Sequence, residues 1–148
     1  RAAFEGLIMD QDTKPRSVLF VCTMNAVRSP MAAGLLRHLK GRALYVESAG
    51  VQADALDPLA VQVMAELGIM LDAHQPKSFD EFRNQEFDLV VALSKEAELY
   101  ARAQSSAARI EYWATADPTQ EEGSLEQRKA AYRAVRDGLK RRIAAQFA

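Results

Sequence analysis

The single cysteine of this chain stands where a nucleophile would be useful. Cys22 directly follows the apolar run at residues 18–21, and Arg28 comes six positions later. A thiolate is a strong nucleophile and a guanidinium group can hold two oxygens of one phosphate group, so this pair fits chemistry on a phosphate ester. The plainer alternative is that Cys22 is a small buried hydrophobe at the end of a strand. An arginine and then Ser29 at this spacing, after an apolar run, rarely occur together by chance, which favours the functional interpretation.

The residues between the cysteine and the arginine are suited to binding an anion. They are Thr23, Met24, Asn25, Ala26 and Val27. A loop that joins a strand to a helix can point successive backbone N–H groups inward, and the helix N-terminus adds positive potential. Asn25 tolerates left-handed backbone angles, and Pro30 fits the first turn of a helix, where a missing N–H costs nothing. We therefore predict a phosphate-binding loop, or P-loop, over residues 23–28, with Cys22 at its floor, where the amides and Arg28 stabilise a negative sulfur.

Short apolar runs alternate with helical patterns along the rest of the chain. The strands are predicted at residues 18–21, 44–46, 89–92 and 110–113, and the helices at residues 31–39, 59–67, 95–103 and 124–147. The last helix begins with a capping-box pattern, Ser124 and Gln127. Strands that alternate with helices predict an α/β fold with a parallel sheet and right-handed crossovers. In such a sheet ligands bind at the carboxyl ends of the strands, which is where the loop after the first strand lies.

Length and composition limit what else the chain can be. Its 148 residues indicate one domain, predicted over residues 16–148, after a flexible polar arm over residues 1–15. One cysteine excludes a disulfide framework and a cysteine-bound zinc site, and the two histidines do not pair, so we expect no metal and no cofactor. The net charge of -1 gives no support for nucleic-acid binding. Because no apolar run reaches the roughly 18 to 20 residues of a membrane span and no secretion signal opens the sequence, we expect no membrane partner and a cytoplasmic location.

Cys22 and the motif Arg28-Ser29-Pro30, placed directly after an N-terminal strand, resemble the low-molecular-weight protein tyrosine phosphatase family. That family shares its fold with the thioredoxin-coupled arsenate reductases. The resemblance covers nearly the whole chain from Val18 onward. Further matching positions are Ser48-Ala49-Gly50 after the second strand, Asp57-Pro58, Gly68 and Asp88-Leu89-Val90. The resemblance implies a three-layer α/β/α fold, with a four-stranded parallel sheet in the order 2-1-3-4 and the P-loop after the first strand.

Transfer of phosphate to a thiolate requires a proton for the departing oxygen. Two Asp-Pro pairs could supply it, Asp57-Pro58 and Asp117-Pro118. Asp57 precedes an apolar helical stripe and is interpreted as a helix cap. Asp117 lies in the loop after the last predicted strand, and the resemblance implies that it is the general acid. The alternative for Asp117 is an ordinary turn-forming Asp-Pro pair.

The resemblance also gives supporting roles to two serines. Ser29 would donate its hydroxyl to the Cys22 thiolate, and Ser48 would hydrogen-bond Asn25 and fix the loop. Both have a plainer interpretation, as a serine at a helix start and a serine at a strand end.

The sequence departs from the family pattern at three positions. Met24 stands where the family usually carries glycine, and Val27 stands where eukaryotic members carry a second cysteine. Thr119 follows Asp117-Pro118 where a tyrosine-directed enzyme usually has tyrosine, and residues 51–54 are not aromatic either. A pocket for phosphotyrosine normally offers aromatic walls. These departures leave the phosphatase chemistry intact and argue against strong phosphotyrosine selectivity.

Three functions are compatible with these residues. The first, which we favour, is a cysteine-dependent phosphomonoester hydrolase with a phosphocysteine intermediate, for which the resemblance implies phosphotyrosine protein as substrate. Its partners would be a phosphorylated protein or a small phosphomonoester, and its loop would bind phosphate-like oxyanions.

The second function is arsenate reduction on the same loop. The thioredoxin-coupled enzymes pass a disulfide along further cysteines, which this chain lacks, so reduction would depend on an external thiol. The third is a non-catalytic module that binds phosphate or phosphoproteins, although binding alone needs neither Cys22 nor Asp117.

Overall fold

The centre of the structure is a sheet of four parallel strands. The computed structural model describes residues 14–71, 73–105, 107 and 109–148, so residues 1–13 of the predicted arm lie outside the described part. The strands are β1 (Ser17–Cys22), β2 (Tyr45–Gly50), β3 (Leu89–Ala92) and β4 (Arg109–Tyr112), in the order β2-β1-β3-β4. Each neighbouring pair is parallel, so the predicted fold class and strand order are confirmed.

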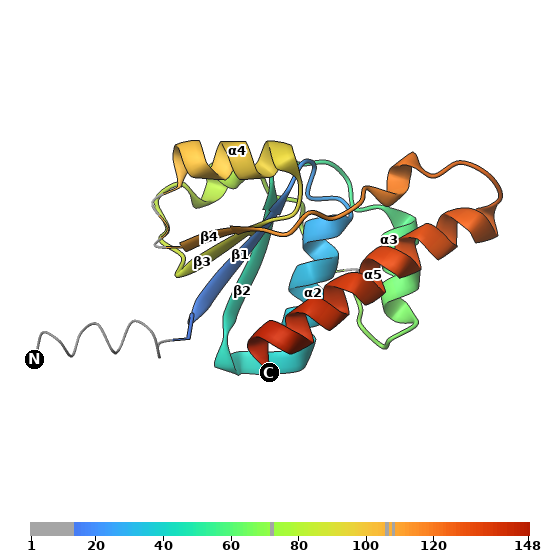
Figure 1. The fold of residues 1–148 in the computed structure, drawn as a ribbon, viewed down its shortest axis with the longest axis horizontal. Helices are drawn as coiled ribbons and strands as arrows, with labels where there is room; N and C mark the ends of the chain where they lie inside the picture. Colours follow the sequence, from blue (N-terminus) through green and yellow to red (C-terminus); the bar gives the residue numbers. More distant parts are fainter. Residues whose placement is uncertain (1–13, 72, 106, 108) are drawn as a thin grey trace, which may run out of the picture.

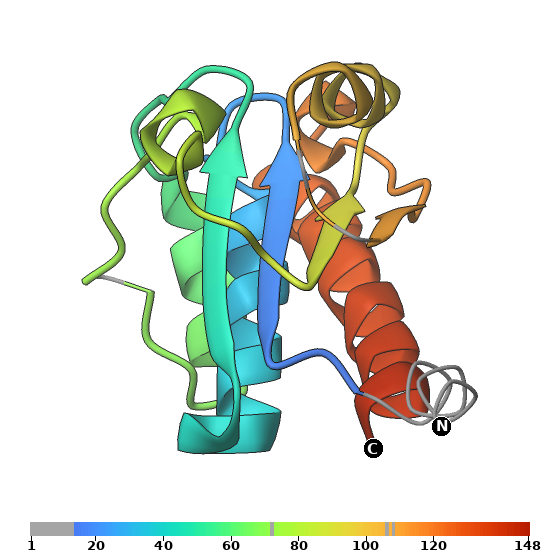
Figure 2. The same cartoon turned by 90° about the vertical axis from the view of Figure 1, so that its left-hand side faces the viewer.

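Helices cover both faces of this sheet (Figure 1, Figure 2). The helices α2 (Arg28–Lys40), α3 (Pro58–Ala65) and α5 (Leu125–Phe147) lie on one face, and α4 (Lys95–Gln104) lies on the other with the short turn η2 (Phe79–Phe82). Because successive side chains of a strand point to opposite faces, Phe20 packs in the larger core with α2 and α5, and Leu19 packs in the smaller core with α4. The three-layer prediction is confirmed.

The two central strands have the nearly continuous apolar sequences that a doubly covered strand requires. All four residues of β3 are buried, as are all residues of β1 after Ser17. Sheets buried on both faces select such runs because neither face meets water. This burial is the reason why β1 and β3 are visible in the sequence, and it fixes the position from which the P-loop departs.

The second strand is longer than its apolar run predicts. It continues through Ser48 to Gly50, so these residues belong to β2 and do not follow it. Their pairing with β1 places Ser48 beside Phe20 and Gly50 beside Cys22, which shows that tertiary pairing outweighs the low strand propensity of small residues. Gly50 is required by space, because a Cβ atom there would lie 2.5 Å from the backbone nitrogen of Asn25.

The helices around the loop follow their predicted signals with small shifts. α2 begins at Arg28, which places Pro30 in its first turn, and the capping box of Ser124 and Gln127 is present at the start of α5. The C-terminal helix thus starts where the sequence predicts. Within the residues that the structure describes, no helix combines the length and the apolar character needed to cross a lipid bilayer.

Candidate active site

The P-loop lies at the carboxyl edge of the sheet, between the end of β1 and the start of α2. β1 has β2 on one side and β3 on the other, so the loop leaves from the middle of the sheet, where α/β folds bind ligands. The N-cap residue of α2 is Val27, whose side chain has no group that could accept a hydrogen bond from the first amides of the helix. Ser29 donates its N–H to the sulfur of Cys22, Pro30 has none, and Met31 donates to the carbonyl of Val27, so the backbone N–H of Arg28 is the one in this turn that is left for an anion.

Cys22 is buried at the floor of this loop, with 2% of its surface exposed. Its Sγ lies 3.0 Å from Oγ of Ser29, and the backbone N–H of Ser29 donates to the same sulfur at 3.4 Å. Both contacts come from the first turn of α2. Hydrogen-bond donors and a helix N-terminus stabilise negative charge on a cysteine sulfur. The geometry is suited to a thiolate that faces a bound oxyanion.

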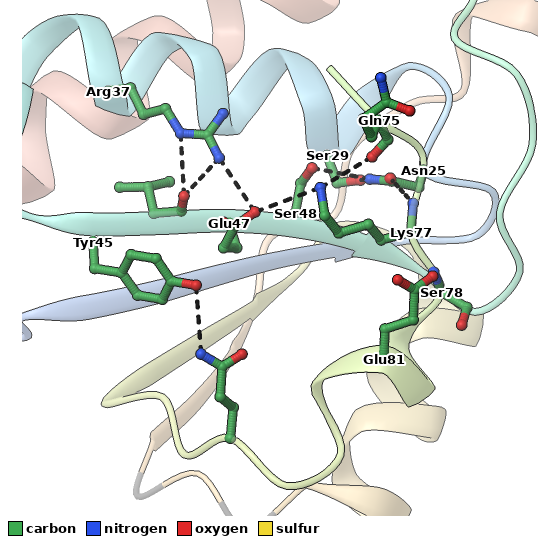
Figure 3. Close-up of polar contacts among 12 residues, drawn as sticks. Asn25, Ser29, Arg37, Tyr45, Glu47, Ser48, Gln75, Lys77, Ser78 and Glu81 are labelled. Carbon is green, nitrogen blue, oxygen red and sulfur yellow. Dashed lines mark hydrogen bonds and ion pairs between the residues drawn. The ribbon is translucent and has the colours of Figure 1, made fainter. Parts of the chain in front are cut away.

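Asn25 holds the middle of the loop in a left-handed conformation, with φ at 54°. Its buried side chain makes three hydrogen bonds (Figure 3). The amide nitrogen Nδ2 donates to Oγ of Ser29 at 2.9 Å and to Oγ of Ser48 at 3.0 Å, and Oδ1 accepts from the backbone N–H of Lys77 at 2.8 Å. The contact that the resemblance implies between Ser48 and Asn25 is thus present. The surrounding structure holds the unusual backbone angle in place.

The hydroxyl of Ser29 has one proton and two acceptors within reach. Because Nδ2 of Asn25 donates to Oγ, the proton of Ser29 is available for the carbonyl of Ala49 at 3.2 Å or for the sulfur of Cys22 at 3.0 Å. A charged acceptor forms the stronger hydrogen bond. The proton therefore turns toward Cys22 when the sulfur is a thiolate.

Four carbonyl groups at Cys22 and in the loop are bonded outward, to the segment at residues 51–57. They accept from the amides of this segment in four bonds, which are Val51 to Cys22 at 3.0 Å, Gln52 to Thr23 at 2.9 Å, Asp54 to Met24 at 3.0 Å, and Asp57 to Ala26 at 3.1 Å. A backbone whose acceptors are bonded outward can present its N–H groups inward. This second segment therefore shapes the P-loop, although it contributes no nucleophile.

One pocket of about 500 Å³ contains the three residues predicted from the sequence to be catalytic, Cys22, Arg28 and Asp117. It is lined by Cys22, by the P-loop residues Thr23, Met24, Ala26, Val27 and Arg28, by residues 54–58, and by Asp117 and Thr119. Nη1 of Arg28 donates to the carbonyl of Thr115 at 3.0 Å, which connects the P-loop to the loop that carries Asp117. Asn25, Ser29 and Ser48 lie behind the pocket wall as buried supports.

The two Asp-Pro pairs have different positions. Asp57 is the N-cap of α3, and its Oδ1 accepts from the amide of Leu59 at 2.8 Å, so its interpretation as a cap is confirmed. Its Oδ2 accepts from the hydroxyl of Tyr132 at 2.7 Å, which leaves neither oxygen without a partner. Asp117 precedes the short turn η3 (Pro118–Gln120) at the pocket wall.

The environment of Asp117 acts on its acidity in two directions. Partial burial raises the pKa of Asp117, but hydrogen bonds from the hydroxyl and amide of Thr119 and the nearby charge of Arg28 lower it more. The net pKa lies below the usual value for an aspartate, so the carboxylate is ionised near neutral pH in the free protein.

Sequence reasoning missed two supports of the loop. The amide of Lys77 is a main-chain group with no side-chain signal, and the hydroxyl of Ser94 lies 3.1 Å from that of Thr23 across 71 positions. Ser94 also caps α4 through the amide of Ala97, and this capping pattern is the only local signal that marks it. In the part of the chain that the structure describes, no group of three or more His, Cys, Asp or Glu side chains is placed to hold a metal ion.

The fold and the loop define a class of α/β protein in which a cysteine at the end of the first parallel strand lies at the floor of the loop that leads into the following helix. The model of one family, described as low molecular weight phosphotyrosine protein phosphatase, matches residues 17–148, and the chain belongs to this family. The resemblance found in the sequence is confirmed.

Relatives in this family include proteins named for two activities. An arsenate reductase of Halalkalibacterium halodurans is 36% identical over 126 residues, which are 85% of this chain and 91% of that protein. A solved arsenate reductase in the phosphate-binding state is 27% identical, with a TM-score of 0.71, over 88% of this chain and 95% of that one. The solved arginine phosphatase YwlE is 25% identical, with a TM-score of 0.71, over 86% of this chain and 90% of that one.

Proposed function

We propose that this protein is a cysteine-dependent phosphomonoester hydrolase that works through a phosphocysteine intermediate. The observation that carries the proposal is the position of Cys22, whose sulfur lies 3.0 Å from Oγ of Ser29 in the same pocket as Arg28 and Asp117. Family membership supports phosphatase-type chemistry. A pocket that only bound phosphate would need neither a nucleophile nor an acid.

In the first step the thiolate of Cys22 attacks phosphorus, the S–P bond forms, and the bond from phosphorus to the leaving oxygen breaks. Arg28 and the inward amides of the loop bind the other phosphate oxygens as charge develops on them. Asp117 gives its proton to the leaving oxygen, which departs as a neutral alcohol or phenol. The pKa of Asp117 is lowered in the free protein, so its carboxyl group is mostly ionised near neutral pH. The proton needed in the first step therefore comes either from the minor fraction of protein with Asp117 protonated or from a substrate that binds as its protonated monoanion.

In the second step a water molecule attacks the phosphorus of the phosphocysteine. Asp117, now a carboxylate, takes one proton from this water. The S–P bond breaks, Cys22 returns as a thiolate, and inorganic phosphate leaves. The hydroxyl of Ser29 stabilises the departing sulfur through the contact described above.

The pocket walls set the expected substrate range. Family membership supports phosphotyrosine protein as a substrate, but no described residue that lines the pocket is aromatic. Packing against an aromatic side chain is what normally stabilises the bound ring of phosphotyrosine. We therefore expect small aryl phosphates and phosphotyrosine peptides to react with similar efficiency.

The test is hydrolysis of phenyl phosphate, a phosphotyrosine peptide, a phosphoserine peptide and phosphoarginine by the wild-type chain and by Cys22→Ser. We expect turnover of the aryl esters by the wild type and none by Cys22→Ser, together with a phosphorylated cysteine in acid-quenched wild-type protein. Turnover by Cys22→Ser near the wild-type rate would refute the mechanism. Phosphate binding without any hydrolysis between pH 5 and 8 would instead support a binding module.

Arsenate reduction with an external thiol is a second candidate, which the 36% identity to an arsenate reductase favours. The thiolate of Cys22 would form a bond to arsenic with loss of water from protonated arsenate. An external thiol would then attack the sulfur of Cys22, the electron pair of the S–As bond would pass to arsenic, and arsenite would leave. A second thiol molecule would reduce the resulting mixed disulfide. Arsenite formation from arsenate and glutathione, measured beside the phosphatase assay, separates the two candidates.

A further inference from the structure

Thr119 makes two hydrogen bonds to one oxygen of the aspartate that we propose as the acid. Its backbone N–H donates to Oδ1 of Asp117 at 3.0 Å, and its hydroxyl donates to the same Oδ1 at 2.7 Å. Both hydrogen bonds from Thr119 go to Oδ1, and the side chain of Gln120 lies close enough to lower the pKa of Asp117 as well. The two oxygens of Asp117 are therefore not equivalent.

The direction of the hydroxyl bond is fixed by the carboxylate, which can only accept, and it is compatible with the contact from the next residue. The side-chain amide nitrogen of Gln120 donates to Oγ1 of Thr119 at 3.4 Å. This amide nitrogen has no lone pair to accept with, and the carboxylate of Asp117 has no proton to give. The hydroxyl of Thr119 must therefore accept from Gln120 and donate to Asp117.

We propose that Thr119 is a positioning residue, whose hydroxyl holds Oδ1 of Asp117 so that Oδ2 carries the proton to and from the substrate. The inference rests on the proposed function, which gives Asp117 its task. Thr119 occupies the place where a tyrosine-directed enzyme of this family usually has an aromatic side chain. Here the same position contributes a hydrogen bond to the acid in place of a wall for the substrate ring.

The hydrogen bond from the backbone N–H of Thr119 to Asp117 is what an ordinary Asp-Pro turn already contains. The hydrogen bond from the hydroxyl is therefore the feature that needs an explanation. A second donor to Oδ1 restricts rotation of the carboxylate and stabilises its charged form, which makes Asp117 a stronger acid in the first step. Substitution of a neutral threonine leaves the other charged or titratable groups around Asp117 in place. These are Cys22, Arg28, Asp54 and Asp57 in the same pocket, Glu121 along the chain, and Tyr132 and Arg142 from α5.

The test compares Thr119→Val, which keeps the shape and loses the hydroxyl, with Thr119→Ser, which restores it. Two substrates are used, phenyl phosphate, whose leaving group needs a proton, and 2,4-dinitrophenyl phosphate, whose leaving group does not. For Thr119→Val we expect kcat/KM on phenyl phosphate, which reports the first step, to fall about tenfold, within what a general acid contributes, while kcat/KM on the dinitrophenyl ester changes less than twofold. The basic limb of its pH profile should move up by about one pH unit, because a charge-assisted hydrogen bond is lost.

Thr119→Ser should restore both the rate and the pH profile, and Glu122→Gln, a change of charge on the same exposed segment, should leave the leaving-group dependence unchanged. Equal loss of activity in the valine and serine variants would contradict the proposal, as would a wild-type pH profile in Thr119→Val.

A carboxyl NMR titration of Asp117 provides a readout without turnover, and it should show a higher pKa of Asp117 in Thr119→Val. If the wild type hydrolyses no ester, the proposed function fails, and an unchanged titration would separately refute the Thr119 contact.

Discussion

Asn25 meets a backbone requirement and a side-chain requirement at one position of the loop. Its φ of 54° is a left-handed angle that asparagine accepts more readily than most residues, and its buried amide group bonds Ser29, Ser48 and the N–H of Lys77. Glycine would satisfy the backbone and lose the side chain, whereas alanine would satisfy neither. Two substitutions at this position therefore separate the two contributions.

We expect Asn25→Gly to lower the free energy of unfolding by about 2 kcal/mol, because it leaves buried polar groups without their partner. Asn25→Ala should lower it by about 1 kcal/mol more, because a Cβ is strained at a left-handed angle. Urea unfolding of the two variants and the wild type measures both steps. Equal stability of the glycine and alanine variants would mean that the backbone angle contributes nothing.

At the level of secondary-structure elements, α3 and α5 are joined by a cluster of charges beyond the active site. Glu66, which follows α3, accepts from Nη2 of Arg133 at 2.8 Å and from Nη1 of Arg136 at 2.7 Å. Hydrogen bonds from these two arginines hold the pKa of Glu66 at about 2. Because the pKa in the folded chain is below that of the unfolded chain, the stabilisation is complete above roughly pH 4.5 and is lost as the pH falls toward 2.

Glu66→Gln should therefore be less stable than the wild type at pH 6, and the difference should shrink as the pH is lowered from 4.5 to 3 and below. The matched control is Glu126→Gln, because Glu126 lies 3.9 Å from Arg133 with 75% of its side chain exposed, and an exposed pair of this kind contributes little. Urea unfolding across this pH range gives both curves. A constant difference between wild type and Glu66→Gln at every pH would contradict the assignment.

A second link between the same elements reaches the P-loop. Tyr132 of α5 donates to Asp57, the cap of α3, whose own amide donates to the carbonyl of Ala26 in the loop. Tyr132→Phe should lower the free energy of unfolding by about 2 kcal/mol, since it removes a hydrogen bond to a partly buried carboxylate, and it should weaken phosphate binding. Tyr45→Phe is the control, because Tyr45 is 46% exposed and its hydroxyl has only a 3.4 Å contact with Gln85. Calorimetric titration measures the Kd for phosphate of both variants. An equal Kd for Tyr132→Phe and Tyr45→Phe would contradict the link to the P-loop.

At the level of the whole molecule, the features that the sequence predicts are local in the chain, and the features that it misses join residues far apart in the chain. Cys22, Arg28 and the doubly buried runs of β1 and β3 are visible because each signal lies within a few residues. The bond from Lys77 to Asn25 spans 52 positions and involves a main-chain amide that any residue other than proline would supply. The end of β2 is also hidden, because small residues there are held as strand by their neighbour β1 and not by their own propensity. Contacts of this kind follow only once the order of the strands is known.

Anion binding at the P-loop should stabilise the entire chain, because the loop joins β1 to α2 and is bonded to the segment before α3. A ligand that binds only the folded state adds about 2.7 kcal/mol at a hundred times its Kd. We expect inorganic phosphate to raise the Tm of the wild type, and Arg28→Lys to lose most of this rise, because lysine cannot hold two oxygens in one plane. Arg42→Lys, at an exposed arginine in η1 (Gly41–Ala43), should keep it. The measurement is the Tm in phosphate and in chloride of equal ionic strength. An equal rise of the Tm in chloride would indicate a general salt effect and would contradict an oxyanion site at Arg28.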